Sequence, residues 1–333
     1  MISPKISVIM ATYNSANYIS KTVDSILNQS FSEFEFIIIN DCSKDNTSEI
    51  LSKYNDSRIK IFNNDKNMGL YKSLNIGFNN SSGNFIARID ADDIAMPDRF
   101  RIQYDYLIDN PSIAMVGCNY YEINSNGDII SDIIKFNAEP IIIKWRMCFE
   151  NPIPSPVLFT RDVYLKVGGF DERSKVGMDY DFFSKVSKVE KISNIQEPIM
   201  HWRVHESSIS SSQGEFQLEN AKDVSRNYVN DFLKEQYTEN DINQLWDRDW
   251  EKYNIIRIVI LFKAYNKILN EKQWSHAEKK KLKTYITNKF IYHFMLHINN
   301  PNIVILFFKA FFLSPDIYLS IFKRRIFKFF NWK

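Results

Sequence analysis

The sequence predicts an α/β protein in which a largely parallel sheet is flanked by helices and followed by a helical extension. Short, apolar, β-branched segments alternate with helix-like segments from residue 6 to residue 109. From about residue 215 onward, Leu, Ile and Phe recur at intervals of three and four residues, which is typical of packed helices. A length of 333 residues accommodates one large α/β domain and such an extension.

The expected strands and helices alternate regularly in the first third of the chain. Each strand is short, rich in Ile, Val and Phe, and followed by polar turn residues. Strands are expected at residues 6–11, 35–39, 58–62 and 84–89, and helices at residues 15–27, 47–54, 71–78 and 97–109. After about residue 140 the alternation weakens, with a strand expected at 157–159 and helices at 161–167 and 179–187.

Composition excludes several classes of protein. The 26 Phe and 17 Tyr against 9 Gly describe a chain that builds a packed core, with no repeat or low-complexity stretch. Three widely spaced cysteines without a Cys-x-x-Cys pair predict neither a disulfide framework nor a zinc site, and favour a reduced cytosol. The apolar run at residues 6–11 is too short for a signal peptide, and no run reaches the roughly 18 residues of a membrane span.

Polar side chains follow three of the expected strands. These clusters are Thr12-Tyr13-Asn14, Asn40-Asp41 and Asp90-Ala91-Asp92-Asp93. Because the carboxyl ends of parallel strands meet at one edge of a sheet, and ligands of such sheets bind there, we expect the three clusters to converge on one site.

The acidic cluster after the fourth strand predicts a metal site. The carboxylates of Asp90, Asp92 and Asp93 repel one another, so a cation or hydrogen-bond donors must compensate them. Oxygen ligands suit Mg²⁺ or Mn²⁺, which bind through one or two carboxylates plus substrate phosphates. An EF-hand is excluded, because the sixth position counted from Asp90 is Ala95 and the twelfth is Arg101. The alternative is an acidic turn that only caps the next helix, with Asp93 as the cap.

Six short motifs occur in one order and spacing that resemble a known family. They are Ala11-Thr12-Tyr13-Asn14, Asn40-Asp41, Asn67-Met68-Gly69-Leu70, Asn75-Ile76-Gly77, Asp90-Ala91-Asp92-Asp93 and Pro97-Asp98-Arg99. The series resembles the family 2 glycosyltransferases, whose GT-A fold is a Rossmann-like, mostly parallel sheet flanked by helices. The resemblance covers about residues 5–210. It implies a GT-A catalytic domain at 1–215, with a nucleotide-sugar half at about 1–117 and an acceptor half at about 118–215, and a helical extension at 216–333.

The resemblance also implies a donor site for a UDP-sugar. The residues implied to bind it are Thr12, Tyr13, Asn14, Asp41, Asn67, Gly69, Lys72, Asp90 and Arg203. By this resemblance Asp41 accepts a hydrogen bond from the uracil N–H, Lys72 contacts the diphosphate, and Asp90 meets both ribose and metal. Many relatives carry Arg where this chain has Leu74, and Lys72 replaces that charge. The alternative for Tyr13 is an aromatic side chain that packs on the first helix.

A second set of motifs implies the acceptor half of the site. Residues 168–171 and 178–183 resemble the family segment in which an Asp at the start of a helix is the catalytic base, which assigns that role to Asp179. A carboxylate base fits a single in-line displacement, which inverts the anomeric carbon. The alternative for Asp179 is an acid favoured only by the helix dipole. Residues 203–210 match a pattern in which Arg203 steadies phosphate and His205 helps Asp92 and Asp90 to hold Mn²⁺ or Mg²⁺.

The end of the chain is basic. Residues 251–333 carry 16 Lys and Arg against 4 Asp and Glu, whereas residues 1–250 carry 26 against 36. Ser314-Pro315-Asp316 predicts a helix start, and the helix that follows has aromatic residues on one side and Arg324, Arg325 and Lys328 on the other. This tail predicts contact with an anionic membrane surface. The alternative is packing on its own domain or on another subunit of a homo-oligomer.

The tail and the resemblance together imply a cytoplasmic enzyme, peripheral on the inner face of the bacterial cell membrane. Its acceptor would be a glycan or lipid-linked glycan of a surface polysaccharide. A nicotinamide dehydrogenase is excluded, because the first turn lacks the Gly-x-Gly-x-x-Gly loop. A nucleotidyltransferase lacks support for want of a glycine-rich phosphate loop, and nucleic-acid binding for want of a recognition module. A non-catalytic nucleotide-sugar-binding or scaffold protein of the same fold stays open, because motifs do not prove turnover.

Overall fold

The computed structural model describes residues 3–173, 177–206, 208, 214–247 and 255–296. The chain divides into two compact units, one comprising Met1–Ala138 and Asn151–Ala221 and the other Glu139–Glu150 and Lys222–Lys333. This division lies near the predicted boundary at residue 215, but it differs in one respect. Residues 139–150, which the sequence analysis assigned to the catalytic domain, belong to the second unit.

The first unit contains one eight-stranded sheet of order β3-β2-β1-β4-β7-β6-β8-β5. The strands are β1 Ile6–Thr12, β2 Phe34–Asn40, β3 Ile59–Asn63, β4 Phe85–Arg88, β5 Ile94–Ala95, β6 Ile113–Ile123, β7 Leu158–Thr160 and β8 Lys191–Arg203. β3, β2, β1 and β4 are parallel, as are β6 and β8, while β7 runs antiparallel between β4 and β6. The predicted mostly parallel sheet is confirmed.

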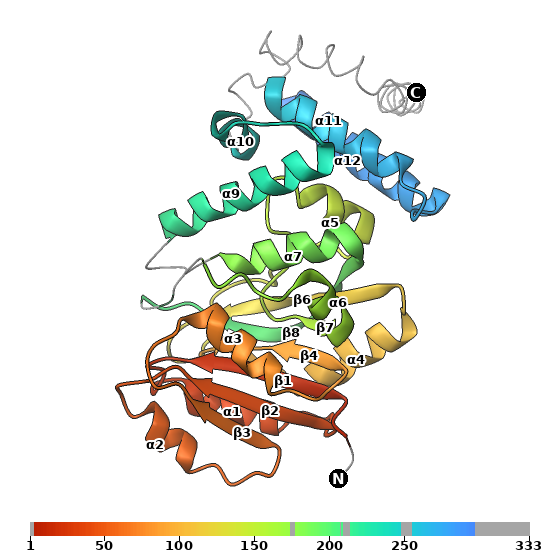
Figure 1. Cartoon of the computed structure of the whole chain (residues 1–333). Helices are drawn as coiled ribbons and strands as arrows, with labels where there is room; N and C mark the ends of the chain where they lie inside the picture. The colour runs from red at the N-terminus through yellow and green to blue at the C-terminus, as the bar shows by residue number, and fades with distance from the viewer. Residues whose placement is uncertain (1–2, 174–176, 207, 209–213, 248–254, 297–333) are drawn as a thin grey trace. The chain divides into compact units, whose positions relative to one another are not determined.

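Helices cover both faces of the sheet because its parallel strands are apolar on both sides. The helices of this unit are α1 Ile19–Leu27, α2 Thr47–Ser52, α3 Leu70–Asn79, α4 Arg99–Asp109, α6 Arg161–Val167, α7 Met178–Val189 and the first turns of α9 Gly214–Leu233. Val8 in β1 packs in one core with Val23 of α1 and Phe100 of α4. Its neighbour Ile9 faces the other way, against Gly77 of α3, which crosses the near face in Figure 1. The period of two in β1 therefore places α1 and α3 on opposite faces.

Two long strands, β6 and β8, were not among the predicted elements. Both contain polar residues and pair through register shifts, so neither shows the alternation of a half-buried strand. Buried Asn119 donates to the Gln196 carbonyl at 2.7 Å, and buried Asn194 donates to the Asn137 and Pro152 carbonyls at 3.0 and 3.1 Å. These side chains are buried because backbone groups far away in the sequence satisfy them.

The second unit is helical over its described residues. Its helices are α5 Pro140–Arg146, most of α9, α10 Glu239–Trp246, α11 Ile255–Asn270 and α12 His276–Leu296. Trp145 of α5 is buried and donates through its indole N–H to the Leu261 carbonyl of α11 at 2.9 Å, while Lys144 pairs with Glu271. These contacts explain why residues 139–150 leave the catalytic domain. Within the described ranges no helix is long and apolar enough to span a membrane, and the predicted amphipathic tail at 315–333 lies outside those ranges.

Candidate active site

The carboxyl ends of β1, β2 and β4 bring the three predicted polar clusters to one edge of the sheet. Thr12 at the end of β1 pairs with Asn40 at the end of β2, and the Asp41 amide donates to the Thr12 carbonyl at 2.8 Å. On the other side of β1, β4 pairs in parallel and leads through Ile89 into Asp90. The predicted convergence follows directly from this parallel register.

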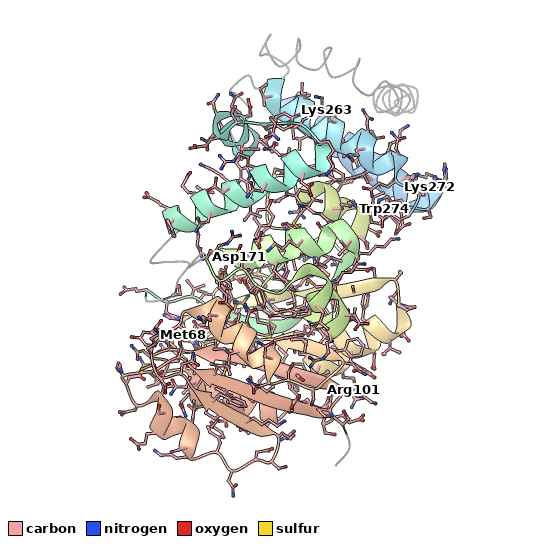
Figure 2. The ribbon with its side chains drawn as sticks, viewed as in Figure 1. Met68, Arg101, Asp171, Lys263, Lys272 and Trp274 are labelled. Atoms are coloured by element: carbon pink, nitrogen blue, oxygen red, sulfur yellow. The ribbon has the colours of Figure 1, made fainter. Side chains whose placement is uncertain are left out.

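Asp41 anchors the loop that leads into α3. Its Oδ1 accepts hydrogen bonds from the Asn64 amide group at 2.8 Å and the Met68 backbone N–H at 2.7 Å, and its Oδ2 accepts from the Gly69 N–H at 2.8 Å. Met68 is labelled in Figure 2, beside the N-terminal end of α3. Gly69 has φ +87°, a left-handed conformation that favours glycine. A carboxylate offers about four lone-pair sites, so Asp41 keeps room for a further donor.

The other predicted nucleotide-binding residues differ in exposure and in whether their polar groups already have hydrogen-bond partners. Thr12 is buried, and its Oγ1 has no hydrogen-bond partner among the described residues. Tyr13 is 46% exposed. Asn14, in contrast, accepts from the Lys44 N–H at 2.7 Å and so joins two loops of the edge. Lys72 lies partly exposed in the first turn of α3, where no hydrogen bond or ion pair within the described residues engages its ammonium group. Asn67 Oδ1 accepts from the Gly69 N–H at 3.2 Å.

In the acidic loop, Asp92 faces His205. The Asp92 Oδ2 and His205 Nε2 atoms are 2.9 Å apart, although the two residues lie far apart in the sequence. Arg203, at the end of β8, is buried and donates through Nε to the Asp92 carbonyl at 2.7 Å and through Nη1 to the Asn124 carbonyl at 2.7 Å. Its guanidinium group also lies over the Tyr18 ring. These contacts tie Arg203 to the acidic loop and to the loop at Asn124, and its predicted phosphate contact stays a prediction.

Asp93 is not the cap of the next helix, because the N-cap of α4 is Asp98. Asp93 is fully buried, and its Oδ1 accepts from the Arg203 backbone N–H at 2.9 Å. Burial, together with the charges of Asp92 and Asp90, raises the pKa of Asp93 well above its ordinary value. Asp93 therefore joins the acidic loop to β8.

The predicted metal ligands are Asp90, Asp92 and His205, and Asp92 and His205 lie side by side. Across the described residues, no group of three or more His, Cys, Asp and Glu side chains is gathered closely enough to hold a metal ion. The predicted set of Asp90, Asp92 and His205 is therefore only partly assembled, because Asp90 is paired with Arg88 instead. Asp92 and His205 offer two ligands, and Mg²⁺ or Mn²⁺ takes most of its remaining ligands from substrate phosphates and water.

Arg88 is a site residue that the sequence analysis missed. This arginine, the last residue of β4, is 4% exposed. Its Nη2 lies 2.8 Å from Asp90 Oδ1, and its Nη1 lies 2.6 Å from Asp179 Oδ2. Burial lowers the pKa of Arg88, but the Asp179 and Asp90 carboxylates outweigh it, so this pKa is raised. A cation inside an apolar strand, two residues before Asp90, was the signal that could have revealed it.

Asp179, the predicted base, lies beside the acidic loop. It is the second residue of α7, near the positive end of the helix dipole. Its Oδ2 accepts from the Ser155 hydroxyl at 2.9 Å and pairs with Arg88, while its Oδ1 has no hydrogen-bond partner among the described residues. Burial raises the pKa of Asp90, which Arg88 opposes and the charge of Asp92 reinforces. One edge of the sheet thus holds Asp41 with room for a further donor, the Asp92–His205 pair, and Asp179, whose buried Oδ1 has no hydrogen-bond partner among the described residues.

Solved structures show the same fold. S. aureus TarS 1–349 in complex with UDP-GlcNAc matches with a TM-score of 0.58 and 19% identity, over 92% of this chain and 90% of that one. The mannosyltransferase PcManGT from Pyrobaculum calidifontis, in complex with GDP-Man and Mn²⁺, matches with a TM-score of 0.50 and 14% identity, over 94% and 89% of the two chains. The chain therefore has the GT-A type of fold.

Sequence relatives define the family. The profile of glycosyl transferase family 2 matches residues 7–159. An uncharacterized glycosyltransferase of Haemophilus influenzae is 35% identical over 246 residues, which are 69% of this chain and 75% of that protein. The O-antigen biosynthesis glycosyltransferase WbnJ of Escherichia coli is 34% identical over 221 residues, 62% of this chain and 82% of that protein. The chain belongs to glycosyl transferase family 2 and is a glycosyltransferase.

Proposed function

We propose that the chain moves a hexosyl group from a UDP-sugar to a hydroxyl group of a glycan acceptor, with inversion of the anomeric carbon. One observation carries the proposal. Asp179, whose buried Oδ1 has no hydrogen-bond partner among the described residues, is joined to Asp90 of the acidic loop through the guanidinium group of Arg88, at 2.6 and 2.8 Å. The proposed base and the loop proposed to bind the donor are therefore separated only by the side chain of Arg88.

The edge of β1 and β2 supports a nucleoside at the end of the sheet. The unpartnered, buried Oγ1 of Thr12 and the remaining lone pairs of Asp41 can both hydrogen-bond to a base or ribose. Exposed Tyr13 offers an aromatic face beside them. The TarS structure contains UDP-GlcNAc, whereas the PcManGT structure contains GDP-Man. The fold therefore accommodates either base, and the choice of uridine for this chain is part of the proposal.

In the proposed reaction, Asp179 Oδ1 takes the proton of the acceptor hydroxyl while that oxygen attacks the anomeric carbon. The bond from that carbon to the diphosphate breaks, and its electron pair goes to the β-phosphate oxygen of the departing UDP. Holding base, nucleophile and donor in line supplies much of the acceleration, and one displacement inverts the configuration. Ser155 and Arg88 both contact Oδ2, which leaves Oδ1 for the proton.

Asp92 and His205 are proposed to hold Mn²⁺ or Mg²⁺, with Asp90 near the ribose. Such an ion, when bound, neutralises charge on the leaving diphosphate. Arg203 and Thr22 support this loop by donating hydrogen bonds to its backbone: Arg203 donates to the Asp92 carbonyl and Thr22 to the Asp93 carbonyl.

The acceptor is proposed to be a lipid-linked glycan of a surface polysaccharide. The relative WbnJ is named for O-antigen biosynthesis, and the basic tail at 315–333 carries the membrane-contact signature described above. We accordingly propose that the enzyme works on the inner face of the cell membrane. Removing residues 315–333 should abolish co-sedimentation with anionic vesicles while UDP binding persists; unchanged sedimentation would contradict the membrane contact and favour packing within a homo-oligomer.

A thermal-shift panel tests the donor. UDP-glucose, UDP-galactose, UDP-N-acetylglucosamine and GDP-mannose are compared with and without Mn²⁺, and a shift for a UDP-sugar that needs the metal supports both donor and cation. Larger shifts with GDP-mannose would refute uridine. UDP release by an Asp179→Asn variant should fall at least roughly 100-fold. NMR of the product gives the anomeric configuration, and retention would refute the single displacement.

A further inference from the structure

Arg88 occupies a position where a buried cation needs explanation. The strand is otherwise apolar, and Arg88 is only 4% exposed. Its backbone is fixed on both sides: its N–H donates to the Val157 carbonyl at 3.1 Å, and it stands opposite Ile9 in the register of β1. Its carbonyl accepts from Arg99 Nη2 at 2.6 Å. The guanidinium group therefore projects from a rigid point of the sheet.

The two acids that Arg88 contacts belong to different parts of the site. Asp90 lies in the acidic loop directly after β4, whereas Asp179 lies on α7, which is far from β4 in the sequence. The planar fork of an arginine can hold two carboxylates at fixed directions, which a lysine ammonium cannot do. Since apolar residues of the same volume often stabilise a protein as well as a buried ion pair does, stability alone does not require arginine here.

We propose that Arg88 is a positioning residue that sets the orientation of the Asp179 base relative to the donor loop at Asp90. This rests on the proposed function, because it assumes that Asp179 is the base. By holding Asp179 Oδ2 together with Ser155, Arg88 directs the unpartnered Oδ1 as the proton acceptor. Because the other terminal nitrogen of Arg88 holds Asp90, the base and the donor loop keep a fixed distance and orientation. A substitution that removes the guanidinium group misaligns the two.

Arg88→Lys is the main test, because it keeps the charge and removes the fork. UDP release is measured with the UDP-sugar that gives the largest shift in the panel, and UDP itself is the probe for binding. We expect kcat to fall roughly 10- to 100-fold, since small misplacements of reacting groups have effects of this size, while the Kd for UDP changes less than about threefold. Wild-type kcat in a folded Arg88→Lys protein overturns the proposal, as does a loss that appears only in UDP affinity.

Arg58→Lys is the matched control. Arg58, immediately before β3, also uses its guanidinium fork, but on the single carboxylate of Asp56, at 3.0 Å through Nε and 2.8 Å through Nη2. Its substitution should leave kcat unchanged, which separates the fork at the site from the general effect of shortening an arginine. An equal loss of kcat in both variants overturns the positioning role.

A double-mutant cycle adds a readout that a merely structural residue would not move. If Arg88 acts through the base, Arg88→Lys combined with Asp179→Asn should be no slower than Asp179→Asn alone, whereas multiplied losses overturn the proposal. Ser155→Ala removes the other partner of Asp179 Oδ2 and should lower kcat less than Arg88→Lys does. Combined with Asp179→Asn, it should likewise be no slower than Asp179→Asn alone. If Asp179→Asn is itself fully active, the proposed function fails; if it is slow while Arg88→Lys is normal, only this inference fails.

Discussion

Glu35 in β2 should make folding stability depend on pH. Its carboxylate is 5% exposed and accepts hydrogen bonds from Lys60 Nζ at 2.7 Å, the Ser7 hydroxyl at 2.6 Å, and the Ser82 N–H and hydroxyl at 2.6 and 2.8 Å. Burial raises the pKa of Glu35, but these donors outweigh it and lower this pKa from 4.5 to about 2. The group therefore stabilises the fold above pH 4.5, and this contribution is lost as the pH falls toward 2.

The size of the effect follows from that shift. A difference of about 2.5 pKa units corresponds to about 3 kcal/mol of stability at pH 7, and about half of it should remain at pH 3. Glu35→Gln should thus lose about 3 kcal/mol in urea unfolding at pH 7, and its difference from the wild type should shrink by about half at pH 3. The Gln amide cannot pair with the Lys60 ammonium, so the variant lacks this pH-dependent part.

Glu33→Gln is the control, on the segment that leads into the same strand. Glu33 pairs with Lys5 at 2.8 Å, but both side chains are about two-fifths exposed, at 42% and 43%. Surface pairs contribute at most about 1 kcal/mol, so this variant should barely change the unfolding curve. The reasoning is refuted if the two variants lose equal stability at pH 7, or if the Glu35→Gln difference is the same at both pH values.

Three further outcomes are expected. Gly83→Ala should lower the free energy of unfolding by about 2 kcal/mol or more, because an added Cβ would lie 2.6 Å from the Ser7 backbone nitrogen. Gly214→Ala is the control, because nothing lies within 4 Å of an added Cβ there. Equal melting temperatures of the two variants would contradict this prediction. Chelation with EDTA should stop UDP release and added Mn²⁺ should restore it, whereas activity that survives chelation contradicts the metal site. His205→Gln should raise the Mn²⁺ concentration for half-maximal activity roughly tenfold, and an unchanged requirement would remove His205 from the set that holds the ion with Asp92.

Local sequence patterns were sufficient for the donor half. The short apolar, β-branched runs and the polar turn residues after them are properties of neighbouring residues, so they predict strand and helix before the chain folds. Because parallel strands share a direction, the residues after them were also placed correctly at one edge, and Thr12, Asp41 and Asp90 lie there. The motifs that resemble family 2 lie in this same region, and the family was confirmed.

Local patterns were not sufficient where contacts over long sequence distances satisfy polar groups. β6 and β8 carry buried amides whose partners are carbonyls of distant loops, so their sequences look irregular. Asp41 was predicted to bind the uracil of the donor, but its carboxylate also accepts hydrogen bonds from the backbone of Met68 and Gly69. Residues 139–150 join the helical unit because Trp145 finds its partner on α11.

The sequence by itself determined the order of strands and helices from β1 to β4, the edge of the sheet that carries the site, and the acids that lie there. Only the tertiary structure decided which charges meet. Asp92 faces His205, and Asp90 faces Arg88, which in turn holds Asp179. The physical reason is that strand ends and helix faces follow from residues a few positions apart, whereas an ion pair depends on the register of β4 against its neighbours and on the position at which α7 begins.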